Sequence, residues 1–136
     1  VDALFRCADL LAPNLEAMRT LYGAADAPEL ARRLFGEYGC SVAVTAGADG
    51  CYFVSPEDGE TRHCPAYPAE AIDTVGAGDA FHGGLLYALS RGAALSRAVE
   101  LGVFCGSFNC RTFGAREGMA RRADLPERFC EFRRER

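Results

Sequence analysis

The stretch DTVGAGDAFHGG, residues 73–84, joins a glycine-rich turn to the start of a helix. The helix is indicated because apolar side chains recur at every fourth position, at Phe81, Leu85 and Leu89. The unpaired N–H groups and the dipole of a helix N-terminus favour a negative charge. We therefore predict that the turn binds an anion or a phosphate group, and that the helix begins near residue 78 or 79 and runs to residue 92.

Asp79 lies inside this predicted anion site, where its carboxylate would repel the ligand unless its chemistry were needed. Gly76 and Gly78 have no side chains, so a ligand can approach the main chain closely. A general base would explain the carboxylate, because phosphoryl transfer to an alcohol needs an acid residue beside backbone donors. A helix cap explains Asp79 equally well from its spacing. Both interpretations stay open at this point.

Composition narrows the class of protein. The chain has 136 residues, 49% of them hydrophobic, which suits one globular domain. Its 19 acidic and 15 basic residues give a net charge of −4, and the bases, all arginines, are scattered. This pattern argues against binding to nucleic acid or to an anionic membrane. No apolar stretch reaches the roughly 20 residues of a membrane-spanning helix, so we expect a soluble, cytoplasmic protein.

The seven cysteines predict reduced thiols rather than disulfides. Their number is odd and no C-x-x-C spacing occurs, which is typical of a cytosolic protein. A metal site at His63 and Cys64 is disfavoured because neighbours on an extended segment point to opposite faces.

Hydrophobic spacing predicts alternating strands and helices. In chain order we expect a strand at 4–12, helices at 15–22 and 27–38, strands around 42–44, 51–54 and 61–66, and helices at about 78–92, 95–109 and 123–136. The last helix would have Leu125, Phe129 and Phe132 on its apolar face.

Small residues mark the two helices that follow the turn. Gly83 and Gly84 each cost a helix about 1 kcal/mol relative to alanine, so something must pack closely there. In the next helix Ala98, Gly102 and Gly106 form a stripe of small residues along one side. These positions predict that another part of the chain packs closely against each helix.

The motifs resemble one known family. DTVGAGDAF matches the signature D-T-x-G-A-G-D-x-F of the ribokinase-like (PfkB) carbohydrate kinases at every specified position. ADLLAPN, TAGADG and CRTFGAREG resemble that family's strand entering P-N, its T-x-G-x-x-G nucleotide loop and its R-x-G-A segment. The resemblance implies a three-layer, ribokinase-like α/β fold with a mainly parallel sheet. It implies that residues 1–136 are the C-terminal part of a single kinase domain, without the N-terminal substrate and lid part.

The resemblance implies ATP-dependent phosphorylation of a hydroxyl on a sugar or sugar-like molecule. Asp79 would be the general base, and the amides of Gly76, Ala77 and Gly78 would form the anion hole. A nucleoside or a vitamin-like alcohol would suit the same base. The alternative is a nucleotide-binding or structural fragment that is inactive alone, because it lacks the groups that orient the acceptor. We expect the whole protein to form a homodimer.

The nucleotide and Mg²⁺ sites are also implied by the resemblance, which assigns nucleotide contacts to Asn14, Thr45, Gly47, Gly50 and Val103. By itself TAGADG is equally well explained as a tight turn between two strands. The family's N-x-x-E motif for magnesium and phosphate reads Asn14-Leu15-Glu16-Ala17 here, so the glutamate is absent from its usual position.

The first acid of the signature helps to bind a monovalent cation such as K⁺ in many members of the family. The residues that match this site are Asp73, Val75, Asn109, Thr112 and Gly114, with main-chain carbonyls as the further ligands. A serine often found just beyond them is replaced by Gly118. The alternative for Asp73 is a side chain that accepts hydrogen bonds from the amides of its own turn.

Overall fold

The computed structural model describes residues 1–133. It divides into two compact units, Val1–Ala66 and Tyr67–Arg136, each of which is described by itself. The predicted helix end at Arg134 and Arg136 lies outside the described residues. None of the helices in the described part of the chain has the length and apolar character needed to cross a bilayer.

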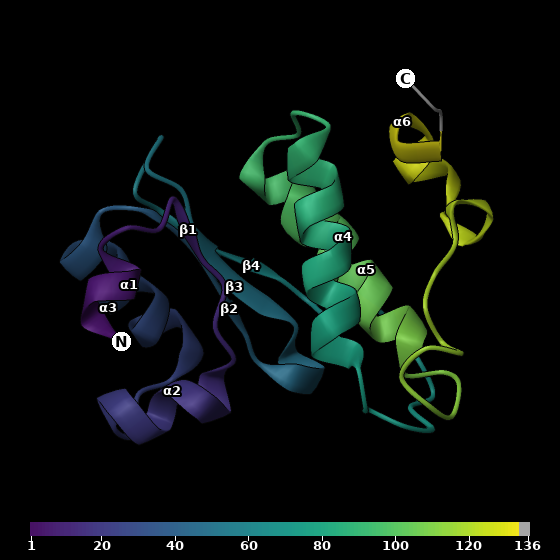
Figure 1. Cartoon of the computed structure of the whole chain (residues 1–136), viewed down its shortest axis with the longest axis horizontal. Helices are drawn as coiled ribbons and strands as arrows, with labels where there is room; N and C mark the ends of the chain where they lie inside the picture. Colours follow the sequence, from purple (N-terminus) through teal and green to yellow (C-terminus); the bar gives the residue numbers. More distant parts are fainter. Residues whose placement is uncertain (134–136) are drawn as a thin grey trace. The chain divides into compact units, whose positions relative to one another are not determined.

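The first unit contains a four-stranded sheet in the order β1-β2-β3-β4 (Figure 1). Its strands are β1 (Leu10–Leu11), β2 (Ser41–Thr45), β3 (Cys51–Val54) and β4 (Thr61–Cys64). Only β1 and β2 pair in parallel, while β2–β3 and β3–β4 are antiparallel. The expectation of a mainly parallel sheet is therefore wrong for these strands. Short turns join β2, β3 and β4, and a parallel pair would need a much longer crossover.

Two helices of this unit confirm the sequence prediction, α2 (Leu15–Tyr22) and α3 (Ala27–Tyr38). The Asp26 side chain caps α3 by accepting a hydrogen bond from the Glu29 amide at 2.7 Å. Figure 1 shows α3 along one face of the sheet. Its apolar face joins the strands in a core of buried side chains that includes Leu11, Met18, Leu30, Leu34, Val42, Val44 and Val54.

The predicted strand at 4–12 is largely wrong. Residues Asp2–Phe5 form a short helix, α1, and only Leu10–Leu11 pair as a strand. Leu4 is 76% exposed, and Arg6 pairs with Asp2 at 3.0 Å, one helical turn apart. A short apolar run does not by its spacing distinguish a strand from a helix.

In the second unit, α4 (Ala77–Ser90) and α5 (Leu95–Asn109) run side by side and are joined by a short loop (Figure 1). A Cβ atom at Gly84 would lie 2.9 Å from the carbonyl oxygen of Leu101, and one at Gly102 would lie 2.9 Å from that of Phe81. The predicted close packing is confirmed at Gly84 and Gly102, where the two helices contact each other, and is wrong at Gly83, where a Cβ atom would meet open space.

The last predicted helix is broken into shorter pieces. Residues Arg122–Asp124 and Glu127–Phe129 form 3₁₀ turns, and α6 spans Cys130–Arg133. Pro126 separates the turns, because proline cannot donate the hydrogen bond that a continuous helix requires. The predicted apolar face is nevertheless buried, at Leu125, Phe129 and Phe132.

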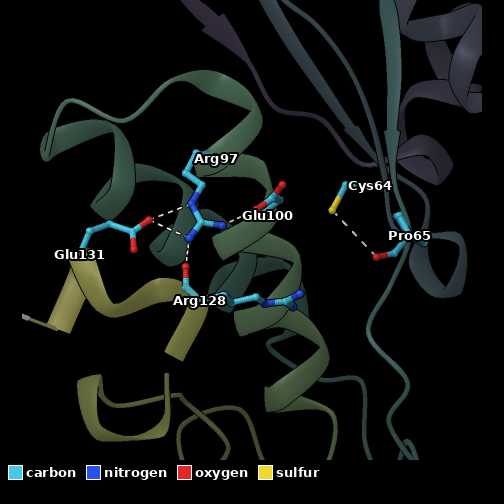
Figure 2. Close-up of polar contacts among 6 residues, drawn as sticks. All are labelled: Cys64, Pro65, Arg97, Glu100, Arg128 and Glu131. Atoms are coloured by element: carbon cyan, nitrogen blue, oxygen red, sulfur yellow. Dashed lines mark hydrogen bonds and ion pairs between the residues drawn. The ribbon is translucent and has the colours of Figure 1, made fainter. Parts of the chain in front are cut away.

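Arg97 of α5 holds this C-terminal segment (Figure 2). Its guanidinium donates hydrogen bonds to the Glu131 carboxylate at 2.8 Å, to the Glu100 carboxylate at 2.5 Å and to the carbonyl oxygen of Arg128. It also lies over the ring of Phe129, 4.6 Å from the centroid. The segment is thus attached to α5 by both charge and aromatic packing.

Candidate active site

The two glycines before and inside the start of α4 have different surroundings. Gly76 is the N-cap, with φ of 81°, and a Cβ atom there would lie 2.6 Å from the Cβ atom of Ala115. At Gly78 a Cβ atom would meet no atom of another segment within 4 Å. Gly76 is therefore needed for the turn itself, whereas Gly78 leaves the main chain open to a ligand.

The amides at this helix end are only partly engaged. The Ala77 N–H donates to the carbonyl oxygen of Thr74 at 3.2 Å. Within residues 1–133, the N–H groups of Gly76 and Gly78 have no acceptor. Of the three amides predicted to form an anion hole, two are available for a ligand in this conformation, at the positive end of the α4 dipole.

Asp79 lies in the first turn of α4, and its side chain is exposed. The helix cap is Gly76, and no residue of the described chain donates a hydrogen bond to the Asp79 carboxylate. The alternative interpretation of Asp79 as a helix cap is therefore wrong. Its carboxylate has no structural partner, so it is available to accept a proton from a bound molecule.

A hollow of about 240 Å³ opens beside Asp79 within the second unit. Its walls come from one face of α4, from α5 and from the segment that follows residue 118. They are made by Asp79, Ala80, Gly83, Gly84, Tyr87, Leu101, Cys105, Met119, Ala120, Arg121, Arg122 and Leu125. We did not predict this hollow from the sequence, although the spacing of Asp79, Gly83 and Tyr87 on one helix face is a signal for it.

The hollow is mostly apolar. Asp79 is the one carboxylate among its lining side chains, and Arg121 and Arg122 are the cationic groups. Burial raises the pKa of the Cys105 thiol to about 11, so this side chain stays neutral at physiological pH. Among the lining groups, Asp79 is thus the candidate proton acceptor.

Asp73 joins two loops of the same unit. Its Oδ1 accepts a hydrogen bond from the Val75 amide at 3.0 Å, and its Oδ2 accepts one from the Gly114 amide at 2.9 Å. The amides of Ile72 and Asp73 in turn donate to the carbonyl oxygen of Cys110. The bonds from Val75 and then Gly114 hold the pKa of the Asp73 carboxyl below its ordinary value. The interpretation of Asp73 as a side chain that organises its own turn is confirmed.

The five residues predicted to surround a monovalent cation lie in this loop cluster. Asp73 contacts Val75 and Gly114, and the Thr112 amide donates to the carbonyl oxygen of Asn109 at 3.3 Å. Asn109 is fully buried, and its Oδ1 has no hydrogen-bond partner within the described residues. No group of three His, Cys, Asp or Glu side chains in residues 1–133 could hold a metal ion. The monovalent-cation site stays a prediction.

In the first unit, TAGADG is the hairpin turn between β2 and β3. Gly47–Asp49 form a 3₁₀ turn, and the Ala46 amide donates to the carbonyl oxygen of Gly50 at 2.8 Å. Gly50 has φ of 90°, and a Cβ atom there would lie 2.2 Å from the carbonyl oxygen of Cys64. The interpretation as a tight turn is confirmed, and a contact with nucleotide stays a prediction.

Asn14 and Thr45 come together at the ends of β1 and β2, where they form a parallel bridge. The Asn14 Oδ1 caps α2 by accepting hydrogen bonds from the Glu16 and Ala17 amides at 2.8 and 3.2 Å. Within residues 1–133 its side-chain NH₂ group donates no hydrogen bond, and its contact with nucleotide stays a prediction. Val103 belongs to the other unit and is only 5% exposed, so its side chain offers little surface to a nucleotide.

Residues 1–122 match the pfkB family of carbohydrate kinases. The chain belongs to this family. It is 30% identical over 125 residues to the ribokinase of Lactococcus lactis subsp. lactis (strain IL1403), an overlap of 90% of this chain and 39% of that protein. The chain thus spans less than half the length of this relative.

Solved structures show the same fold. The ribokinase of Thermotoga maritima superposes with a TM-score of 0.81 and 26% identity, over 96% of this chain and 45% of that one. A fructokinase double mutant of Vibrio cholerae O395, in fructose-, ADP- and potassium-bound form, superposes with a TM-score of 0.73 and 29% identity, over 85% of this chain and 38% of that one. The ribokinase-like fold expected from the motifs is confirmed.

Proposed function

We propose that the chain is the catalytic-base and nucleotide-binding part of an ATP-dependent kinase that phosphorylates a hydroxyl of a sugar or a sugar-like molecule. The observation that carries this proposal is the start of α4. There a carboxylate without a structural partner, Asp79, directly follows Gly78, whose open position and free amide suit a phosphate group. Membership of the pfkB family supports the reaction class.

In the proposed reaction Asp79 accepts the proton of the acceptor hydroxyl. The hydroxyl oxygen forms a bond to the γ-phosphorus of ATP, the bond from that phosphorus to the β–γ bridging oxygen breaks, and ADP leaves. The amides of Gly76 and Gly78 stabilise negative charge on the phosphoryl oxygens, because they are held in place before the reaction begins. Mg²⁺ would enter bound to the ATP phosphates. It would need few ligands from the protein, because substrate phosphates and water supply most of its coordination.

The proposal is tested by turnover of the natural polypeptide that contains this chain. ADP release is measured with Mg-ATP against a panel of acceptors: pentoses, hexoses, sugar phosphates and nucleosides. We expect Asp79→Asn to lower kcat on the active acceptor by about 10²-fold or more, with the Kd for nucleotide changed by less than about twofold. Asp9→Asn, an exposed acid of the first unit, serves as the matched control and should keep the activity of the wild type.

Two results would count against the proposal. Unchanged turnover in Asp79→Asn removes Asp79 as the base. Nucleotide binding without turnover on any acceptor favours the alternative, a nucleotide-binding or structural piece that catalyses no transfer.

A further inference from the structure

His63 forms a short hydrogen bond to the TAGADG turn. It lies in β4, the last strand of the sheet, and is exposed. Its Nε2 lies 2.6 Å from the carbonyl oxygen of Asp49, the last residue of the 3₁₀ turn Gly47–Asp49. A carbonyl oxygen only accepts hydrogen bonds, so Nε2 carries a proton and donates. The bond therefore joins β4 to the turn between β2 and β3.

Tyr52 of β3 holds the imidazole ring from a second side. Tyr52 and His63 are direct partners in the antiparallel pair β3–β4. Their rings stack, with centroids 4.2 Å apart and an interplanar angle of 13°. Tyr52 itself packs against the core of the first unit. A cross-strand aromatic pair of this kind restricts the His63 side chain, so its donor is in position before any ligand binds.

The hydrogen bond from His63 acts on one peptide group of the turn. The Asp49 carbonyl belongs to the same planar peptide as the Gly50 amide, which donates to the carbonyl oxygen of Gly47 at 3.0 Å. Glycine has a wide choice of backbone conformations, so this peptide rotates easily unless something restrains it. His63 supplies a restraint, because it keeps the Asp49 carbonyl oxygen directed toward β4.

The direction of this carbonyl matters for an anionic ligand. If the Asp49 carbonyl oxygen turned toward a bound phosphate, the two would repel each other, because both carry negative charge. A turn that is already held in one conformation also binds a ligand without the cost of ordering it. The restraint from His63 thus favours nucleotide binding on both counts.

We propose that His63 is a positioning residue for the nucleotide. It acts through the Asp49–Gly50 peptide and contacts neither ATP nor the acceptor. The inference rests on the proposed function, because it takes the TAGADG turn, with the predicted contacts Thr45, Gly47 and Gly50, as part of the nucleotide site.

The test compares nucleotide binding by two variants of the natural polypeptide that contains this chain. His63→Phe keeps a flat ring beside Tyr52 but has no donor, and we expect it to raise the Kd for an ATP analogue by roughly three- to tenfold, the effect of one hydrogen bond. His63→Gln places a side-chain NH₂ group near the position of Nε2 and should restore most of the affinity. Calorimetric titration without acceptor measures both, and an equal Kd in His63→Phe and the wild type overturns the inference.

Arg62→Ala is the matched control. Arg62 precedes His63 in β4, so its side chain lies on the opposite face of the sheet, where it pairs with Asp58. This variant should keep the wild-type Kd for the analogue. A merely structural role of His63 would lower the urea midpoint of His63→Phe and leave its Kd unchanged. Equal weakening by His63→Phe and His63→Gln would show that the donor is not responsible, and would also overturn the proposal.

Steady-state kinetics provide a second measurement. Because the proposed role concerns nucleotide binding and not proton transfer, His63→Phe should raise the KM for ATP. Its kcat at saturating ATP and its KM for the acceptor should stay within about twofold of the wild type. A fall in kcat with an unchanged KM for ATP contradicts the proposal.

The binding experiment separates failure of this inference from failure of the proposed function. A wild type that does not bind the ATP analogue rejects the nucleotide site, and with it the proposed function. A wild type that binds the analogue no more tightly than His63→Phe rejects only the role of His63 and leaves the assignment of Asp79 untouched.

Discussion

The two glycine-rich loops look alike as sequence but differ as structures. TAGADG, residues 45–50, is a closed hairpin turn in which Gly50 has no room for a side chain. DTVGAGD, residues 73–79, ends at a helix N-terminus where Gly78 faces open space and its amide has no acceptor in residues 1–133. A glycine can therefore mark either a backbone that must fold tightly or a backbone that a ligand must reach, and only its surroundings distinguish the two.

The largest expected effect concerns the closed loop. Gly50→Ala should lower the free energy of unfolding by about 2–4 kcal/mol, because the substitution adds strain at positive φ and places Cβ against the carbonyl oxygen of Cys64. Gly47→Ala, with φ of 57° and no atom within 4 Å, is the matched control and should cost about 1 kcal/mol. Urea unfolding measures both, and equal costs would show that Gly50 is not confined by β4.

A second pair tests the same contrast inside α4. We expect Gly84→Ala to cost about 1–3 kcal/mol, since its Cβ would lie 2.9 Å from the Leu101 carbonyl oxygen and from Cys105 Sγ. Gly83→Ala has open space and should instead stabilise the helix by up to about 1 kcal/mol. Opposite signs in the two urea midpoints would support the close packing of α4 on α5, whereas two stabilising substitutions would contradict it.

The open loop should respond in binding rather than in stability. Gly78→Val should raise the Kd for nucleotide by about tenfold or more, equivalent to roughly 1.4 kcal/mol, because the side chain blocks approach to the main chain. The urea midpoint should fall little, since a Cβ atom at Gly78 would meet no other segment of the protein within 4 Å. Calorimetric titration with an ATP analogue measures the affinity. Gly78→Ala, which adds a smaller side chain, should weaken binding less than Gly78→Val. Equal affinity in wild type and Gly78→Val would remove the phosphate site from this loop.

The smallest expected effect on stability concerns Asp73, whose carboxylate accepts hydrogen bonds from two loop amides. Amide donors lower its pKa from the ordinary 3.8 in the folded state, so its contribution to stability is complete above that pH and declines as the pH falls through the folded value. Asp73→Asn should therefore be less stable than the wild type near pH 7, and the difference should shrink at acid pH, below the ordinary 3.8. Urea unfolding at both pH values measures this, and a difference that is independent of pH would show that the charge of Asp73 is not involved.

The sequence predicted well wherever local signals were strong. The helices at 15–22, 27–38 and 95–109 have the predicted bounds, because their apolar faces are encoded by neighbouring residues, and the first two also have side-chain caps, at Asn14 and Asp26. Leu125, Phe129 and Phe132 were correctly placed in the core, although Pro126 divides the predicted helix around them. The short apolar segment at 4–12 was misjudged, since its state depends on which strand it can pair with.

The motif DTVGAGDAF by itself indicated the family, because it matches the family signature at every specified position, and the match of residues 1–122 to the family confirms it. Only the tertiary structure decided which acid is committed to the fold. The Asp73 carboxylate accepts a hydrogen bond from the amide of Gly114, which is far away in the sequence. The Asp79 carboxylate accepts no hydrogen bond from residues 1–133. The sequence also did not reveal that the buried Oδ1 of Asn109 has no hydrogen-bond partner within residues 1–133. The partners of a buried group come from distant segments that only folding brings together.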